Sequence, residues 1–190
     1  MVLSKAEVWA MLQGAKLLKH KILIGLLYGC GLRCMEARCV RLQDLDFDRK
    51  QLKVVQGKGK KDRYVPLSVH LIRGLKKYIE AEKPKEYLFN GQPIERSGGD
   101  FDSRYSQRGV QWAVKTVAKS VGITKEVHVH SLRHTYATHL LEDGMDIITL
   151  KDLLGHQNLE TTLEYSQIAQ LESQQKFSPL DTLFAQCSSK

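Results

Sequence analysis

Four residues in the C-terminal third of the chain have the types and order needed for chemistry on a phosphodiester. His130 and Arg133 stand three residues apart, His156 follows a Leu-Gly pair, and Tyr165 lies nine residues further on. Arginine offers a planar set of donors that fits phosphate oxygens, histidine transfers protons near neutral pH, and a phenol becomes a nucleophile once it loses its proton. Together these groups could attack a phosphodiester and hold one product covalently.

Each of these residues also has an ordinary structural explanation. His130 and Arg133 at a helix start can project from one face toward a phosphate, but a surface arginine beside a capping histidine has the same spacing. Tyr165 alone is typical of a half-buried packing residue. The order of all four residues, rather than any one of them, carries the chemical interpretation.

Two further basic positions lie earlier in the chain. Arg33 follows a glycine-flanked turn, and Glu36 stands three residues after it, a spacing that also suits an ordinary ion pair on one helical turn. Lys58 lies between two glycines at the tip of a predicted β-hairpin, where a solvated basic turn is the simpler explanation. Lys60 and Lys61 are close rivals of Lys58, and spacing alone does not choose among them.

The elements expected to position these residues are mainly helical. A capping box at residues 4–7 predicts a helix at the start of the chain. Further helices are expected over residues 22–28, 36–40, 68–83, 110–121, 132–143 and 146–154, with a helical stretch after residue 161. Residues 52–55 and 63–67 predict the hairpin, residues 87–89 a third strand, and residues 90–103 an exposed loop. The expected fold class is therefore α+β, mainly α-helical, with a small antiparallel sheet.

Composition is consistent with a polyanionic partner. The 190 residues carry 29 Lys+Arg against 21 Asp+Glu, a net charge of +8 and a pI near 9.3. There is no run of eighteen apolar residues and no secretory signal pattern, so no membrane association is expected. The four cysteines, Cys30, Cys34, Cys39 and Cys187, include no Cys-x-x-Cys pair, which argues against a disulfide framework or a zinc knuckle. A cytoplasmic location is expected.

Four sequence blocks in this order resemble the tyrosine recombinase (phage integrase) family, most closely its Xer-like bacterial members. They are YGCGLRCME at residues 28–36, GKGKKDRYVPL at 57–67, HSLRHTYATH at 130–139, and LLGH at 153–156 with TTLEY at 161–165. The resemblance runs from about residue 3 to residue 165 and beyond. It implies the catalytic-domain fold of that family of DNA breaking-rejoining enzymes.

The resemblance also implies a role for each residue that would act on the phosphate. Arg33 and Arg133 would hold the scissile phosphate, and His156 would donate a hydrogen bond to it. Lys58 would protonate the leaving 5′ oxygen, and His130 would assist the proton of the nucleophile. Fixed donors of this kind stabilise the charge that grows on phosphorus during attack.

Tyr165 would be the nucleophile, giving a 3′-phosphotyrosyl intermediate. Glu36 would hold Arg33 in position without binding the phosphate itself. No metal, cofactor or ATP is implied, because arginines neutralise the charge and the phosphotyrosine retains the bond energy. The sequence after Tyr165 departs from the usual family pattern, which could alter how its helix packs. Further contacts with DNA are predicted for Lys60, Lys61, Arg63 and His134.

The resemblance also implies how the chain is organised. Residues 1–176 are expected to form the catalytic domain and residues 177–190 a C-terminal tail, with the N-terminal core-binding domain of the family absent from this chain. The expected partner is double-stranded DNA, on which the protein would assemble as a tetramer. The tail is a candidate for exchange between subunits, although a tail folded on its own core is equally consistent with its sequence.

Three other functions remain open on the sequence. A catalytically silent, sequence-specific DNA-binding protein would need the same basic surface. A topoisomerase-like relaxing enzyme would use nearly the same active site. A metal-dependent nuclease or phosphatase could use the histidines at positions 128, 130, 134 and 139, although their spacing matches no familiar ligand motif. Whether a recombinase of this kind would integrate, transpose or resolve DNA also remains open.

Overall fold

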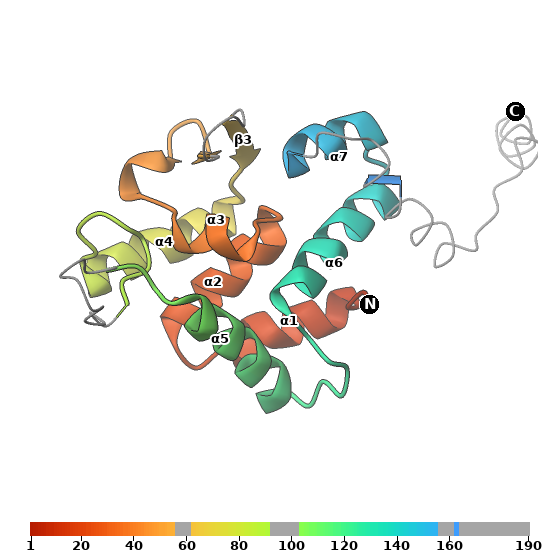
Figure 1. The fold of residues 1–190 in the computed structure, drawn as a ribbon, viewed down its shortest axis with the longest axis horizontal. Helices are drawn as coiled ribbons and strands as arrows, with labels where there is room; N and C mark the ends of the chain where they lie inside the picture. Colours follow the sequence, from red (N-terminus) through yellow and green to blue (C-terminus); the bar gives the residue numbers. More distant parts are fainter. Residues whose placement is uncertain (56–61, 92–102, 156–161, 164–190) are drawn as a thin grey trace, which may run out of the picture.

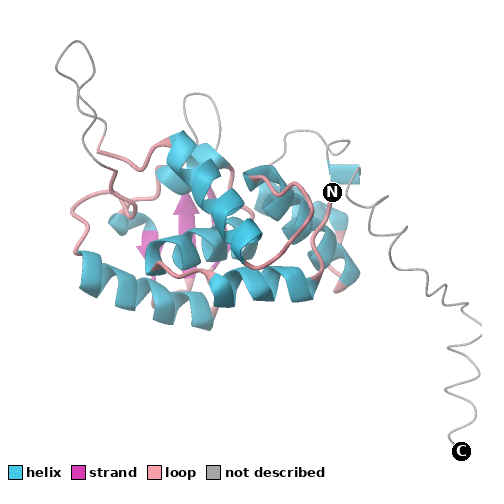
Figure 2. Cartoon of the chain, turned by 90° about the horizontal axis from the view of Figure 1, so that it is seen from below, coloured by secondary structure: helices cyan, strands magenta, loops and turns pink. Residues whose placement is uncertain are grey.

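The computed structural model of the chain describes residues 1–55, 62–91, 103–155 and 162–163. Within them it is mainly helical with one small antiparallel sheet, which confirms the predicted fold class (Figures 1 and 2). No helix in these ranges is both long and apolar enough to cross a membrane. The elements are α1 (Lys5–Gly14), α2 (Leu18–Gly29), α3 (Cys34–Arg38), the 3-10 helix η1 (Leu42–Asp44), β1 (Leu45–Asp46), β2 (Gln51–Val54), β3 (Arg63–Pro66), α4 (Val69–Glu82), α5 (Gln107–Ser120), α6 (Val129–Glu142) and α7 (Ile147–Leu154).

Helix ends follow the signals in the sequence. The Ser4 hydroxyl accepts from the Glu7 amide at 3.2 Å, and the Glu7 carboxylate accepts from the Ser4 amide at 2.7 Å, so the predicted capping box is confirmed. Ser68 caps α4 as expected, and α7 is closed by Gly155, which follows Leu154 in the left-handed conformation with φ 64°. The helix expected over residues 36–40 begins and ends two residues earlier, because α3 runs over Cys34–Arg38 and Val40 lies beyond it.

The sheet is antiparallel with the order β1-β2-β3. The predicted hairpin is confirmed, with Val54 opposite Arg63 at the end nearer its tip. The segment predicted as a third strand, residues 87–89, makes an isolated antiparallel bridge between Tyr87 and Arg41 and does not join the sheet, whose third strand is β1. Leu88 and Phe89 are both fully buried in the core.

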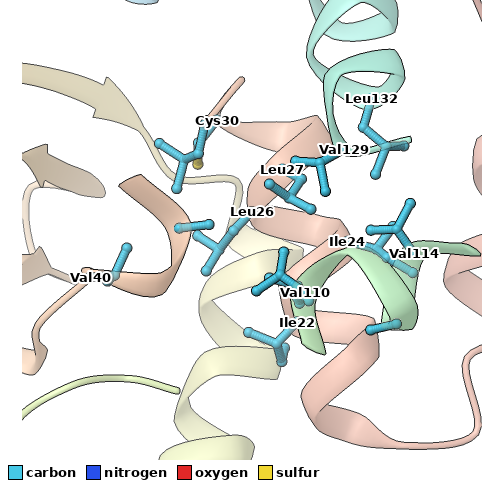
Figure 3. Packing of buried hydrophobic residues seen from close by; sticks show 14 of the residues in the cluster. Ile22, Ile24, Leu26, Leu27, Cys30, Val40, Val110, Val114, Val129 and Leu132 are labelled. Atoms are coloured by element: carbon cyan, nitrogen blue, oxygen red, sulfur yellow. The ribbon is translucent and has the colours of Figure 1, made fainter. Parts of the chain in front are cut away.

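The main hydrophobic core surrounds α2. Its side chains Leu23, Ile24 and Leu27 have no exposed surface, and they pack with apolar side chains of α5 and α6 such as Val114 and Leu132 (Figure 3). This core holds the end of α2, and therefore the turn that leads to Arg33, in a fixed place.

A second, smaller cluster anchors α7. It contains Leu150 and Leu154 from α7 with Tyr136 and Ala137 from α6. Helix α7 contacts α6 and β3, so its C-terminal end lies close to the sheet (Figure 1). The end of α7 is therefore attached through this small cluster and through Leu153, which packs against the main core.

The turn between α2 and α3 depends on Gly31. Its φ of 59° lies in the left-handed region, and a Cβ at this position would come within 2.5 Å of the Tyr136 ring. We expect Gly31→Ala to lower the free energy of unfolding by roughly 3 kcal/mol, because backbone strain and overpacking act together. Urea unfolding measures this loss.

Gly122→Ala is the matched control for this glycine. Gly122 has φ 78°, but a Cβ there would meet nothing within 4 Å. Only the backbone cost remains, so the loss should be about 1 kcal/mol. Equal losses in the two variants would show that contact with Tyr136 does not matter.

Candidate active site

The carboxylate of Glu36 is the centre of the candidate site. Glu36 lies in the first turn of α3, where its Oε2 accepts from the backbone amide of Arg33 at 2.8 Å. Its Oε1 accepts from Nη1 of the same arginine at 3.0 Å. The carboxylate thus caps the short helix and orients the Arg33 side chain, which is 36% exposed and can reach a ligand.

Arg63 binds the same carboxylate from β3. Its Nη1 donates to Oε1 of Glu36 at 2.8 Å and its Nη2 to Oε2 at 2.9 Å, a bidentate pair. Its Nε donates to the carbonyl of Leu153 at 2.8 Å. The side chain is only 7% exposed. The sequence predicted a contact of Arg63 with DNA, whereas in the structure all three of its guanidinium nitrogens donate to protein acceptors.

Arg133 reaches the site from the first turns of α6. Its Nη1 donates to the carbonyl of Gly31 and lies 3.9 Å from Oε2 of Glu36, and its Nη2 donates to the carbonyl of Leu154 at 2.7 Å. The side chain is 4% exposed. Arg33 and Arg133, which the family resemblance predicts to hold one phosphate, are therefore brought to a common carboxylate.

The arginines keep Glu36 ionised. Burial alone would raise the pKa of this carboxyl, but hydrogen bonds and charge from Arg63, the Arg33 amide and the charge of Arg133 together lower its pKa to about 2. The site thus retains a fixed negative charge that aligns the guanidinium groups across the whole pH range in which proteins normally work.

The low pKa predicts that Glu36 stabilises the fold in a pH-dependent way. An unfolded glutamate titrates near pH 4.3, so this stabilisation is complete above that value and is lost as the pH falls toward about 2. In Glu36→Gln the titration is absent. We expect the variant to be less stable than wild type at neutral pH, with a pH-dependent part on the order of 3 kcal/mol that shrinks in acid.

Urea unfolding between about pH 7 and about pH 3 measures this difference. The matched control is Glu126→Gln, which removes a carboxylate from a side chain that is 76% exposed. If the two variants differed from wild type by the same amount at every pH, the arginine cluster would not be what stabilises the Glu36 carboxylate.

Of the other residues predicted for the site, the structure describes His130 and His134. His130 is exposed in the first turn of α6, and His134 is partly buried one turn later. Lys58, Lys60, Lys61, His156 and Tyr165 lie outside the described residues.

The four histidines considered for a metal site do not form one in the part of the chain that the structure describes, where no group of three or more potential ligands gathers. His128 lies 3.3 Å from Glu126, and Nδ1 of His139 is 2.9 Å from the Tyr28 hydroxyl. These two histidines, at opposite ends of α6, thus have separate partners.

Sequence analysis missed the place of Arg63 in this cluster, although a signal was available. In β3, Arg63 and Val65 are buried while Tyr64 and Pro66 are exposed, so the two-residue period of the strand turns Arg63 inward with Val65. The carbonyls of Leu153 and Leu154 could not have been found in this way, because every residue carries one.

Comparison with known proteins identifies relatives of this chain. The model of the phage integrase family matches residues 1–172. A tyrosine recombinase of Pseudothermotoga lettingae is 39% identical over 164 residues, 85% of this chain and 53% of that protein. Another, of Thermosipho africanus, is 42% identical over 167 residues, 87% of this chain and 54% of that protein. The chain thus spans about half the length of the curated relatives it matches.

Solved structures show the same fold. The crystal structure of XerA recombinase aligns with a TM-score of 0.77 and 24% identity, covering 100% of this chain and 66% of that one. XerH site-specific recombinase, in a post-cleavage complex with palindromic difH substrate, aligns with a TM-score of 0.74 and 24% identity, covering 90% and 51%. With a family match over nearly its whole length, this chain belongs to the phage integrase family, whose members similar to it include Xer-type tyrosine recombinases.

Proposed function

We propose that the protein is a site-specific DNA recombinase that cleaves and rejoins DNA through a 3′-phosphotyrosyl intermediate. The observation that carries this proposal is the pair Arg33 and Arg133, held on the single carboxylate of Glu36. Relatives named as tyrosine recombinases and a XerH structure in a post-cleavage DNA complex support it.

The arginine pair supplies the electrostatic part of the reaction. Attack on a phosphodiester places additional negative charge on the oxygens of a five-coordinate phosphorus. Arg33 and Arg133 offer guanidinium groups whose positions are set by Glu36 and backbone carbonyls before substrate arrives. Preorganised donors stabilise the transition state more than the ground state, which accelerates cleavage.

The remaining residues make and break the bonds to phosphorus and transfer the protons. The Tyr165 oxygen forms a bond to phosphorus while the bond from phosphorus to the 5′ oxygen breaks. His130 accepts the phenol proton, Lys58 donates one to the leaving 5′ oxygen, and His156 donates a hydrogen bond to the phosphate. In rejoining, a 5′ hydroxyl attacks the phosphotyrosine, so the bond energy is retained and neither ATP nor a metal is required.

The proposed substrate is double-stranded DNA, gripped by a basic surface that includes Lys60, Lys61 and His134. Residues 1–176 act as the catalytic domain within a tetramer assembled on DNA. The tail over residues 177–190 serves as a segment passed to a neighbouring subunit. The reaction takes place in the cytoplasm.

A covalent trapping experiment tests the proposal. The protein is incubated in EDTA with a pool of randomised nicked duplexes labelled at the 5′ or the 3′ end, denatured and run on a gel. A protein–DNA adduct that retains only the 5′ label is expected, since the tyrosine holds the new 3′ end. Sequencing the trapped DNA then identifies the target.

The same experiment separates the rival functions. A silent DNA-binding protein retards DNA without forming an adduct, and a metal-dependent nuclease cleaves only without EDTA. A topoisomerase-like enzyme forms the adduct but relaxes supercoiled plasmids that lack the trapped target. Absence of any adduct would overturn the proposal.

A further inference from the structure

Arg63 joins three segments that lie far apart in the sequence. It begins β3, its guanidinium binds Glu36 in α3, and its Nε binds Leu153 near the end of α7, 90 residues away. A side chain with a buried, bidentate ion pair and a third directed hydrogen bond has little rotational freedom. The three segments are therefore held at set distances from one another by a single residue.

The contact with Glu36 acts on the arginines that would hold the phosphate. Arg63 occupies both carboxylate oxygens, while Arg33 donates to Oε1 and Arg133 lies 3.9 Å from Oε2. Rotation of the carboxylate would disturb every one of these contacts. By fixing the plane of the carboxylate, Arg63 sets the directions in which Arg33 and Arg133 can point.

The contact with Leu153 acts on the segment before His156. The last carbonyls of a helix have no partner within the helix, and in α7 those of Leu153 and Leu154 accept from Arg63 and Arg133. Gly155 follows in the left-handed conformation. Arg63 thus anchors the turn of α7 that leads directly to the histidine predicted to act on the phosphate.

The position of Arg63 on β3 adds the hairpin to this arrangement. Val54 of β2 pairs with Arg63, and the residues between these two positions include Lys58. The strand that follows the segment containing Lys58 is therefore tied to the carboxylate that orients the arginines.

We propose that Arg63 is a positioning residue that aligns the phosphate-binding arginines with the hairpin and with the segment that leads to His156. It acts through Glu36 and the Leu153 carbonyl, without touching DNA. This inference rests on the proposed recombinase activity.

The test measures single-turnover adduct formation on the nicked duplex selected from the pool, together with affinity for the intact duplex. Arg63→Met should form the adduct on the order of 100-fold more slowly than wild type, because the arginine pair is misaligned. Its DNA affinity should stay within about threefold, since the replaced side chain is buried. Arg63→Lys retains the positive charge but not the planar guanidinium that binds both carboxylate oxygens, so it should recover part of the rate.

A pH profile distinguishes positioning from mere loss of stability. Without Arg63 the pKa of Glu36 should rise from about 2, so adduct formation by Arg63→Met should fall more steeply than in wild type between about pH 7 and about pH 5. Combining Arg63→Met with Glu36→Gln should remove this added steepness. If Arg63→Met only lowered the folded fraction, adding Glu36→Gln would not remove the added pH dependence.

Arg49→Met is the matched control, since it removes the same charge from a side chain that is 81% exposed, and it should react like wild type. A folded Arg63→Met protein that forms the adduct at the wild-type rate, or loses rate only in proportion to DNA affinity, would overturn the inference. If Arg63→Met does not fold, wild-type adduct formation by Arg63→Lys would overturn it equally. Failure of the wild-type protein to form any adduct would instead count against the recombinase activity itself.

Discussion

Tyr165→Phe is expected to form no covalent adduct with nicked DNA while binding the same DNA within about twofold of the wild-type affinity. The substitution removes one oxygen atom, the one proposed to attack phosphorus, and leaves the aromatic ring. Loss of a catalytic nucleophile typically lowers the rate on the order of 10⁴-fold or more. The measurement is the trapping assay, with affinity determined separately by gel retardation.

Tyr64→Phe is the matched control for this prediction. Its side chain lies in β3 and is 58% exposed, and removal of its hydroxyl should leave adduct formation unchanged. An adduct that persists in Tyr165→Phe would assign the attack to a different residue, and one lost only in Tyr64→Phe would identify that residue.

Arg133→Ala should lose both stability and activity. The guanidinium donates to the carbonyls of Gly31 and Leu154 and lies beside Glu36 in a buried place. Its removal leaves these acceptors without a donor, so we expect a loss of about 3–5 kcal/mol in the free energy of unfolding. Cleavage should fall by about 10²–10³-fold in the molecules that remain folded.

Arg133→Lys separates the two effects. An ammonium group restores positive charge but cannot span both carbonyls, so the variant should regain more stability than rate. Urea unfolding and single-turnover trapping measure the two quantities, with exposed Arg73→Ala as the control. Wild-type stability and cleavage in Arg133→Ala would contradict both the structural and the catalytic assignment.

Local signals account for most of the fold that was predicted. The capping box of Ser4 and Glu7, the Ser68 cap and the Gly155 terminus each involve residues close together in sequence, so their physics is visible without the fold. Residues 87–89 failed as a strand because burial of Leu88 and Phe89 is decided by distant parts of the chain. The true third strand, β1, is too short to have a periodicity of its own.

The candidate site likewise combines contacts between residues close in sequence, which can be predicted, with contacts set by the packing of distant elements. The pairing of Arg33 with Glu36 follows from a spacing of three residues, and the sequence predicts it directly. The approach of Arg133 to Glu36 depends on how α6 packs against α2 and was anticipated only through family resemblance. Arg63 was assigned to DNA because it is a cation in a basic hairpin, whereas the alternation of β3 turns it inward.

The small cluster that anchors α7 has a consequence for motion. Only Leu150 and Leu154 of this helix are fully buried, in the smaller cluster, and Leu153 adds a partly buried contact with the main core. Units with few buried contacts open at a lower free energy than the whole domain, and they open as one piece. Undocking of α7 would break the arginine contacts with Leu153 and Leu154 and leave α2 packed. The turn of α7 that carries these two carbonyls would then leave the arginines by a local opening, with no need for global unfolding.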